Sequence, residues 1–172
     1  MISISKIKIP LLIFLILLFA QCSVNYTFTG ASVPIEAKTF SIKPFDNFAP
    51  TVNPQLASSL TDQLYMKIMT STSLTSQSFD GDMAFEGTVV GYSLSPLLSR
   101  GDASVAEQTR LTITVKVKFQ NRYNSKDNYE ASFSQYADFE SSASFSSVEQ
   151  TLMEDVVEEL VKDIFNKAFV NW

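Results

Sequence analysis

The most regular alternation of apolar and polar residues in this chain runs from Arg110 to Arg122. Odd-numbered positions up to Phe119 are apolar and even-numbered positions are polar or charged, which is the two-residue period of a strand with one buried face. The pattern predicts a β-strand whose other face, rich in threonine and basic residues, meets solvent. Its buried face is expected to carry Leu111, Ile113, Val115, Val117 and Phe119.

Four further segments have strand patterns, and one of them changes phase partway along. Thr39 to Phe45 alternates, Tyr129 to Phe139 does so with aromatic residues on one side, and a shorter strand is expected from Leu74 to Phe79. From Met83 to Leu94 the parity of the apolar positions switches between Gly87 and Gly91, as happens where one extra residue is inserted. We therefore expect a β-bulge in that strand.

Two segments have the apolar spacing of amphipathic helices. The first follows the capping residue Asn53 and Pro54, and it has leucine or isoleucine at every fourth position from Leu56 to Ile68. The second is expected to start at Ser146, with Glu149 as its capping-box partner. Its apolar stripe comprises Val148, Leu152, Val156, Leu160 and Ile164, widened by Met153, Val157, Val161, Phe165 and Phe169.

The order of these elements is strand, helix, several strands and a final helix. Two helices with one apolar stripe each, and a sheet with one apolar face, bury those surfaces most simply as two layers. The predicted fold class is therefore α+β, a two-layer sandwich of a mostly antiparallel sheet of four to five strands with two helices packed on one face. The other face of the sheet is left polar and uncovered.

The N-terminus has the composition of an export signal. Lys6 and Lys8 precede a run from Ile9 to Ala20 that is apolar almost throughout, interrupted by Pro10. As a helix this run would extend about 18 Å, short of the roughly 30 Å hydrocarbon core of a bilayer. The segment therefore indicates export in preference to a transmembrane anchor.

Cys22, the single cysteine of the chain, follows this run directly after Phe19-Ala20-Gln21. The arrangement resembles a bacterial lipoprotein signal, in which a cysteine is acylated before cleavage, and an unpaired thiol in an exported chain is otherwise a liability. The alternative is an incidental cysteine near an ordinary cleavage site. On the lipoprotein interpretation residues 1–21 are the signal peptide, residues 22–36 are the lipidated N-terminus and tether, and residues 37–172 form a single α+β domain.

The composition of the chain limits the catalytic and metal sites that it can form. The chain has no histidine and one cysteine, which excludes imidazole-based triads, an internal disulfide and the usual zinc and iron sites. No paired carboxylates are placed convincingly for catalysis, so we expect no enzymatic activity and no cofactor. Loss of Lys6 and Lys8 with the signal leaves 13 minus 2, or 11, basic residues against 18 acidic ones, a net charge of −7. We expect no binding of nucleic acid by so acidic a chain.

The basic residues are nevertheless concentrated near the clearest strand. Four of them have even numbers, so an unbroken strand would project all four from its polar face: Arg110, Lys116, Lys118 and Arg122. There they are candidate contacts for a phosphorylated or carboxylated ligand, or for a partner. The alternative is that they are solvated charges, partly paired across the sheet with Glu86, Glu130 or Asp138.

Several segments together resemble the LptE family of lipopolysaccharide-assembly lipoproteins. They are the strand from Phe85 to Tyr92, RLTITVKVKFQNRYN from Arg110 to Asn124, SFSQYADF from Ser132 to Phe139, and the helix from Ser146 to Phe169. The likeness extends over nearly the whole chain after the signal, and the order of elements agrees.

The resemblance implies a lipid-anchored protein on the periplasmic side of the outer membrane. Members of the family pair with the β-barrel translocon LptD, plug the barrel, assist its assembly and contact lipopolysaccharide on its way to the cell surface. A well-packed core with a hydroxyl-rich outer face is compatible with a hydrated barrel lumen. The alternative function is a lipid-anchored structural adaptor of another envelope complex, which recognises protein only and binds no lipopolysaccharide.

Overall fold

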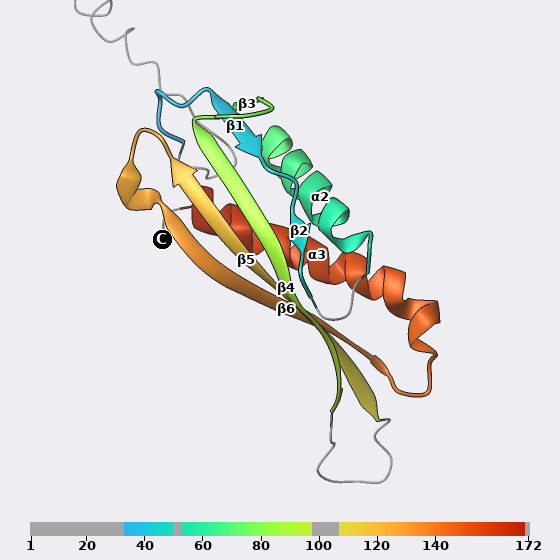
Figure 1. Ribbon diagram of the computed structural model, residues 1–172. Coiled ribbons are helices and arrows are strands. Elements are labelled where there is room, and N and C mark those ends of the chain that lie inside the picture. The colour runs from blue at the N-terminus through green and yellow to red at the C-terminus, as the bar shows by residue number, and fades with distance from the viewer. Residues whose placement is uncertain (1–32, 50–52, 98–106, 171–172) are drawn as a thin grey trace, which may run out of the picture.

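A computed structural model describes residues 33–49, 53–97 and 107–170 of this chain (Figure 1). Cys22, the predicted signal peptide and most of the predicted tether lie outside the described residues, so export, lipidation and the proposed domain division stay predictions. The elements within these ranges are β1 Thr39–Ile42, β2 Asp46–Asn47, α2 Leu56–Ser71, β3 Thr75–Ser76, β4 Met83–Leu97, β5 Gln108–Asn121, the short 3-10 helix η1 Ser125–Asp127, β6 Tyr129–Glu140 and α3 Phe145–Phe169.

Three long antiparallel strands form the body of the sheet. β4 pairs with β5, and β5 with β6, along almost their full lengths, and the sheet order is β3-β1-β4-β5-β6. The short strands differ, because β1 pairs in parallel with both β3 and β4, and β2 pairs in parallel with β4 further along. The predicted mostly antiparallel sheet is confirmed, with parallel pairs on the β1 side, but the described residues form six strands instead of four to five.

The first predicted strand is divided at Pro44. The segment expected from Thr39 to Phe45 begins as β1, and pairing with β4 resumes only at β2. Proline has no N–H to donate to a neighbouring strand. Phe45 is buried with its ring against Gly87, where any β-carbon would overlap the ring. Gly87 therefore makes room for Phe45 where the chain passes between the two short strands.

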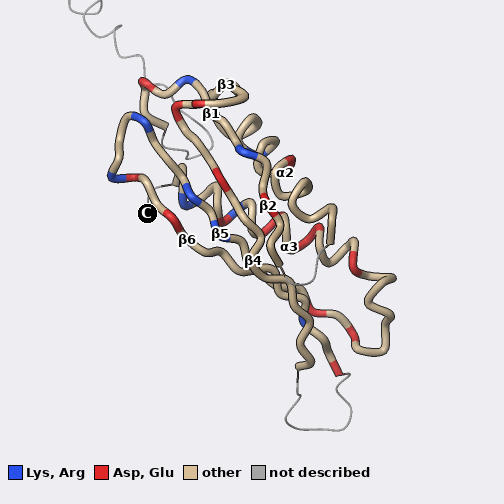
Figure 2. Tube along the Cα trace, in the orientation of Figure 1, with Lys and Arg blue, Asp and Glu red and all other residues tan. Residues whose placement is uncertain are grey.

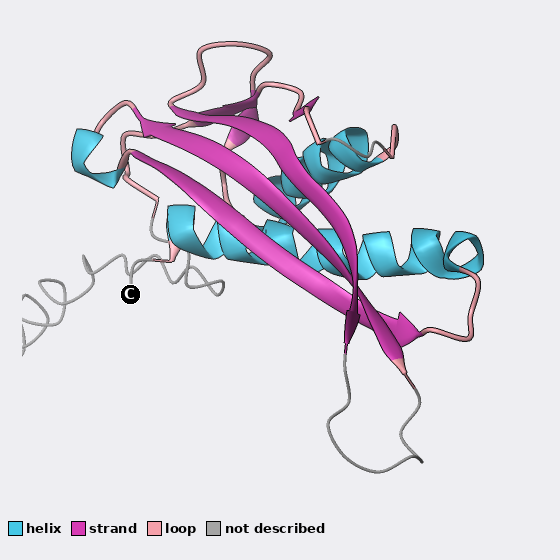
Figure 3. Ribbon diagram, turned by 60° about the horizontal axis from the view of Figure 1, so that its bottom comes forward, coloured by secondary structure: helices cyan, strands magenta, loops and turns pink. Residues whose placement is uncertain are grey.

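Both helices cover one face of the sheet, as Figures 1 and 3 show. The four predicted stripe residues of α2 are fully buried, namely Leu56, Leu60, Leu64 and Ile68. The predicted stripe of α3 is buried as well, from Leu152 to Phe169, with Val148 partly buried against the core. The helices thus form a second layer that contacts the apolar face of the sheet, and the predicted two-layer α+β sandwich is confirmed.

Aromatic rings fill one end of this core. The ring centres of Phe85 and Phe119 lie 4.9 Å apart across the β4–β5 pair. Phe169, at the end of α3, lies 6.0 Å from Phe85 and 6.3 Å from Phe119. Tyr129 of β6 meets Phe119 at 5.3 Å. Tilted and edge contacts at these distances add to the free energy of burial, so they hold the last turn of α3 on the sheet.

The predicted bulge in β4 is confirmed. The register of β4 on β5 shifts between Val89 and Gly91, so Val90 is the extra residue, and its side chain is 43% exposed. Beyond the bulge Tyr92 is again buried. The inserted residue therefore allows Val89 and Tyr92 to share the helix-covered face although one is odd and the other even.

The start of α2 and the extent of β3 differ from the prediction. α2 begins at Leu56, and Asn53 accepts a hydrogen bond from the Gln55 N–H at 3.0 Å in the preceding turn instead of capping the helix. The strand expected from Leu74 to Phe79 shrinks to Thr75–Ser76, and its contact with β1 is extended by a hydrogen bond from the Gln77 N–H to the Phe40 carbonyl oxygen at 2.8 Å.

The start of α3 also differs. The helix begins at Phe145 with Ser144 in the capping position, so Ser146 lies inside the first turn and the predicted capping box is wrong. The reason is that the Glu149 carboxylate turns away from the helix terminus and accepts hydrogen bonds from other elements.

Candidate functional site: the polar face of the sheet

The face of the sheet opposite the helices is open (Figure 3). Along β5 the odd-numbered residues from Leu111 to Phe119 are at most 1% exposed, whereas the even-numbered residues are partly or fully exposed. Arg110, Lys116 and Lys118 therefore all project from this polar face, as predicted. Hydroxyl groups lie between the charges, and those of Thr114 and Ser134 are 3.0 Å apart.

Arg110 is already bound to its neighbours on β6. Its Nε and Nη2 donate hydrogen bonds to the two carboxylate oxygens of Asp138 at 2.7 and 2.8 Å, and its guanidinium lies 3.5 Å over the ring centre of Tyr136. The hydrogen bonds from Arg110 lower the pKa of the Asp138 carboxyl group and raise the pKa of Arg110. This two-point pair neutralises much of the Arg110 charge, but it uses only two of the N–H groups of the guanidinium, and the others can still meet a ligand.

Lys116 and Lys118 line a hollow of about 230 Å³ on the same face. Lys116 forms an ion pair with Glu130, and its hydrogen bond is the main cause that lowers the pKa of the Glu130 carboxyl group. The charged lining of the hollow consists of three lysines and three carboxylates, namely Lys43, Lys116, Lys118, Asp46, Glu86 and Glu130.

The lysines of this hollow are not equally engaged. Lys118 stands opposite Glu86 on β4 and Glu130 on β6. Within the described residues, however, neither Lys118 nor Lys43 forms an ion pair. Besides Lys116, the charge of Lys118 helps to lower the pKa of the Glu130 carboxyl group, but an anion can approach Lys118 and Lys43 without breaking an ion pair.

Arg122 lies at the edge of the polar face, where it lines a hollow of about 340 Å³ together with Ala84 and Gln120. β5 ends at Asn121, and the Arg122 guanidinium turns to the β3–β4 connection, where it lies 3.7 Å from a carboxylate oxygen of Asp82. It also donates to the Asp80 carbonyl oxygen at 3.1 Å. Although β5 ends one residue earlier, the Arg122 N–H still donates to the Asp82 carbonyl oxygen at 2.9 Å, so the side chain stays on the side of the sheet that parity predicts.

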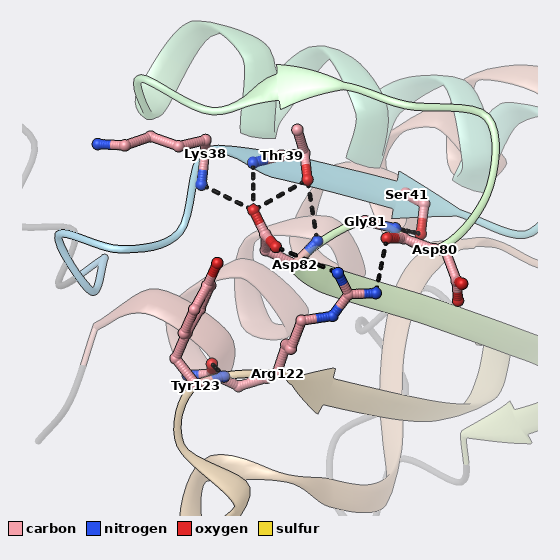
Figure 4. Close-up of polar contacts among 9 residues, drawn as sticks. Lys38, Thr39, Ser41, Asp80, Gly81, Asp82, Arg122 and Tyr123 are labelled. Atoms are coloured by element: carbon pink, nitrogen blue, oxygen red, sulfur yellow. Dashed lines mark hydrogen bonds and ion pairs between the residues drawn. The ribbon is translucent and has the colours of Figure 1, made fainter.

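Asp82 joins three segments at this end of the sheet (Figure 4). Its Oδ2 accepts hydrogen bonds from the Lys38 N–H at 2.9 Å and from the Thr39 N–H and hydroxyl at 3.0 Å, while its Oδ1 faces Arg122. These interactions, with the Lys38 N–H foremost, lower the pKa of the Asp82 carboxyl group against the opposing effect of burial. Sequence reasoning missed this residue, because its partners are backbone groups more than forty positions away.

A second polar link holds the helices to the sheet. The Tyr92 hydroxyl donates to Glu149 Oε1 at 2.7 Å, and Asn53 Nδ2 donates to the same oxygen at 2.8 Å. Burial, and then the hydrogen bond to Glu149, raise the pKa of Tyr92 above its ordinary value. The link connects β4, α3 and the entry to α2, so it stabilises the scaffold that presents the polar face.

The helix layer has a groove of its own. A groove of about 430 Å³ lies between α2 and α3, lined by Met66, Lys67, Val161 and their neighbours. In the part of the chain that the structure describes, no cluster of acidic or sulfur side chains is arranged to hold a metal ion. None of the described helices has the length and apolar character needed to span a bilayer.

Solved structures share this architecture at low sequence identity. A minor lipoprotein from Acinetobacter baumannii matches with a TM-score of 0.50 and 16% identity, over 76% of this chain and 91% of its own. A putative neuraminyllactose-binding hemagglutinin homologue from Helicobacter pylori matches with a TM-score of 0.52 and 13% identity, over 83% of this chain and 89% of its own. These likenesses define the class of protein by its fold, a small α+β domain with two helices on one side of a long-stranded sheet.

The family follows from the sequence. The sequence model of the LptE lipopolysaccharide-assembly family matches residues 37–168, from just before β1 to the last turn of α3. The chain belongs to the LptE family, and the resemblance found in its strand and helix sequences is confirmed. Among proteins with curated functions, none matches this chain significantly.

Proposed function

We propose that this protein is a non-enzymatic, lipid-anchored assembly factor that plugs and helps assemble an LptD-type β-barrel and assists lipopolysaccharide transport to the cell surface. The observation that carries the proposal is the family match, which extends over all but the margins of the described domain. The anchor is a set of acyl chains on Cys22 at the periplasmic side of the outer membrane. Several acyl chains bind a bilayer durably, whereas a single chain binds reversibly.

The open sheet face supports a place inside a hydrated barrel. A barrel lumen is polar and wet, so a plug needs an outer surface that forms hydrogen bonds while a separate core holds it together. The face opposite the helices has such groups along β5 and β6, including Thr112, Thr114, Ser132, Ser134 and Tyr136. The two helices on the other face supply the core, so the polar face is free for the partner.

The hollow of β4 and β5 is the proposed contact for the anionic part of lipopolysaccharide. Lys118 has no ion-pair partner among the described residues, and Lys116 beside it shares its charge with Glu130. Phosphate groups bind such ammonium groups through charge-assisted hydrogen bonds. Arg110 and Arg122, which already bind Asp138 and Asp82, are proposed as contacts for the barrel.

Co-purification tests the partnership. The protein is extracted in detergent from its native envelope through a C-terminal tag, and its N-terminus and companions are identified by mass spectrometry. We expect an acylated Cys22 at the N-terminus and a barrel protein of the LptD class in stoichiometric amount. A Cys22→Ala variant serves as the control for anchoring. Recovery of the acylated protein without any barrel protein would overturn the proposal.

A structural adaptor of another envelope complex is the second candidate, and one observation favours it. The three lysines of the hollow are balanced by three carboxylates, and such a mixed surface suits a protein partner as well as a phosphate. Lipopolysaccharide that raises the melting temperature of the purified protein supports the transport function. A melting temperature that lipopolysaccharide leaves unchanged, together with capture of a partner other than the barrel, supports the adaptor.

A further inference from the structure

One end of the domain exposes three large apolar side chains. Ile35 is 86% exposed, Phe79 is 82% exposed and Tyr123 is 49% exposed. Ile35 precedes β1, Phe79 lies in the β3–β4 connection and Tyr123 follows β5, and these segments meet at the same end of the molecule (Figures 1 and 2). Single exposed apolar side chains are common, but three on neighbouring connections form a candidate contact surface. We call this surface the entry end, because the chain enters the domain here.

Polar contacts fix the three connections of the entry end to one another (Figure 4). Asp82 holds the chain after Ile35 through the N–H groups of Lys38 and Thr39. Arg122, directly before Tyr123, binds both the Asp82 carboxylate and the Asp80 carbonyl oxygen, the latter directly after Phe79. The apolar side chains therefore project from connections whose relative positions are set in advance, so little conformational entropy is lost when the surface is covered.

The position of the proposed anchor at Cys22 indicates that a bilayer lies next to the entry end. Ile35 follows Cys22 by 13 residues, so a fully extended tether reaches at most about 45 Å, and a relaxed one roughly 20 Å. The opposite end of the sheet lies further away by the length of β4, whose 15 residues extend about 45 to 50 Å. A bilayer that holds the acyl chains of Cys22 is therefore nearer to the entry end than to any other surface of the domain.

The charge of the entry end fits a neutral lipid surface. Residues 33–38, 76–82 and 121–128 carry three basic and four acidic side chains, namely Lys38, Arg122, Lys126, Glu36, Asp80, Asp82 and Asp127 (Figure 2). These charges nearly cancel, so attraction to an anionic or a cationic partner is weak. Apolar and amphipathic side chains such as Phe and Tyr are suited to the boundary between headgroups and acyl chains of a zwitterionic bilayer.

We propose that the entry end docks on the bilayer beside the anchor, with Ile35, Phe79 and Tyr123 inserted at the lipid–water boundary. The inference rests on the proposed Cys22 anchor and adds an orientation to it. This is the arrangement of the anchored protein before it enters a barrel, and it presents the far end of the sheet to other components. It requires no anionic lipid, because the driving force is burial of apolar side chains.

A fluorescent probe tests the proposal on the full-length protein. Ser78→Cys places a single free thiol next to Phe79 in the chain, and Ser93→Cys places one ten residues into β4, away from the entry end, both at exposed serines. Each acylated protein is labelled with an environment-sensitive fluorophore and reconstituted into phosphatidylcholine vesicles whose acyl chains carry bromine. We expect several-fold stronger quenching at position 78 than at position 93. Equal quenching at the two positions would overturn the docking.

Serine variants test whether quenching depends on the three named side chains or on exposed apolar side chains in general. The triple variant Ile35→Ser, Phe79→Ser and Tyr123→Ser is expected to reduce quenching at position 78 to the level at position 93, since loss of one buried apolar side chain weakens partitioning about tenfold. The control triple variant Phe48→Ser, Met66→Ser and Val90→Ser removes apolar side chains that are 74%, 57% and 43% exposed elsewhere, and it is expected to keep the quenching. Loss of quenching in both variants, or in neither, contradicts the proposal.

The mass of the N-terminal peptide distinguishes a failure of the docking proposal from a failure of the anchor proposal. An acylated protein whose Ser78 probe is no more quenched than its Ser93 probe overturns the docking and leaves the anchor intact. A protein without acyl groups whose Ser78 probe is not quenched overturns both, because the short acylated tether is what places the entry end at the bilayer.

Discussion

Tyr92 and Glu149 join the sheet to the long helix through a hydrogen bond of 2.7 Å from the Tyr92 hydroxyl to Glu149 Oε1. Tyr92 reaches this position because the bulge at Val90 returns it to the buried face of β4. Asn53 donates to the same oxygen, so the entry to α2 is tied to the same point. An irregularity in one strand thus fixes how both helices sit on the sheet.

Tyr92→Phe is expected to lower the free energy of unfolding by about 1 to 2 kcal/mol, because it removes the donor and leaves a carboxylate oxygen with fewer partners. Urea denaturation of the full-length protein measures the change. Tyr65→Phe is the matched control, since Tyr65 is 38% exposed and its hydroxyl has no hydrogen bond among the described residues. Equal effects of the two substitutions would show that the Tyr92 hydroxyl contributes nothing specific.

Asp82 is expected to make stability depend on acid pH. Its native interactions lower its pKa, so the stabilisation is fully present above the pKa of the unfolded chain and is lost as the pH falls through the native pKa. Asp82→Asn should therefore lose stability at pH 7, by about 1 to 2 kcal/mol for charge-assisted hydrogen bonds. The difference from the unsubstituted protein should shrink below about pH 4, near the ordinary pKa of aspartate.

Asp80→Asn is the control for this pH dependence. Asp80 lies two residues away in a left-handed conformation, with φ of 57°, which asparagine tolerates, and its carboxylate has no described partner. The free energy of unfolding is measured from pH 3 to pH 7. Its dependence on pH is expected to be weaker in the Asp82 variant than in the unsubstituted protein, and the same in the Asp80 variant as in the unsubstituted protein. Parallel curves for all three proteins would contradict the role of Asp82.

Gly81 is expected to tolerate no side chain. A β-carbon at this position would overlap the backbone of Phe40 and Ser41 in β1, and backbone atoms cannot move aside as a flexible side chain can. Gly81→Ala should therefore lower the melting temperature clearly, with a cost of about 1 to 3 kcal/mol as for other overpacked sites. Gly91→Ala is the comparison, because its β-carbon would lie 3.2 Å from the Thr114 side chain, and we expect a smaller loss. The reverse order would contradict this account of the β1 contact.

Local periodicity was sufficient to predict the long strands and helices. The alternation from Leu111 to Phe119 admits one assignment of faces, because a shift of one residue would expose every apolar side chain. The four-residue spacing of Leu56, Leu60, Leu64 and Ile68 likewise defines a single buried stripe. The bulge was predictable for the same reason, since the change of parity marks it in the sequence.

The candidate site was predictable only in part. Arg110, Lys116 and Lys118 lie where parity places them, and Arg122, one residue beyond the end of β5, lies at the edge of the same face. The pairing of each cation depends on which residue of β6 stands opposite, which is set by the register of the β5–β6 pair. The role of Asp82 could not be predicted from the sequence, because its partners lie at the start of a parallel strand that is close to Asp82 only in the folded chain.

Charge reversal in the hollow tests the ligand contact. The double variant Lys116→Glu and Lys118→Glu is expected to weaken binding of purified lipopolysaccharide by at least about tenfold, because a charge-assisted hydrogen bond to phosphate contributes about 1.5 kcal/mol or more. Calorimetry or fluorescence titration at fixed ionic strength measures the affinity, since added salt weakens such contacts.

The double variant Lys126→Glu and Lys162→Glu is the matched control for that experiment. It makes the same change in net charge, and Lys162 pairs with Glu159 on α3 much as Lys116 pairs with Glu130 on the sheet. Its affinity for lipopolysaccharide is expected to stay within about twofold of the unsubstituted protein, because screening leaves little long-range effect at physiological salt. If both double variants bind as the unsubstituted protein does, the lysines of the hollow are solvated partners of their neighbouring carboxylates and the anionic ligand binds elsewhere.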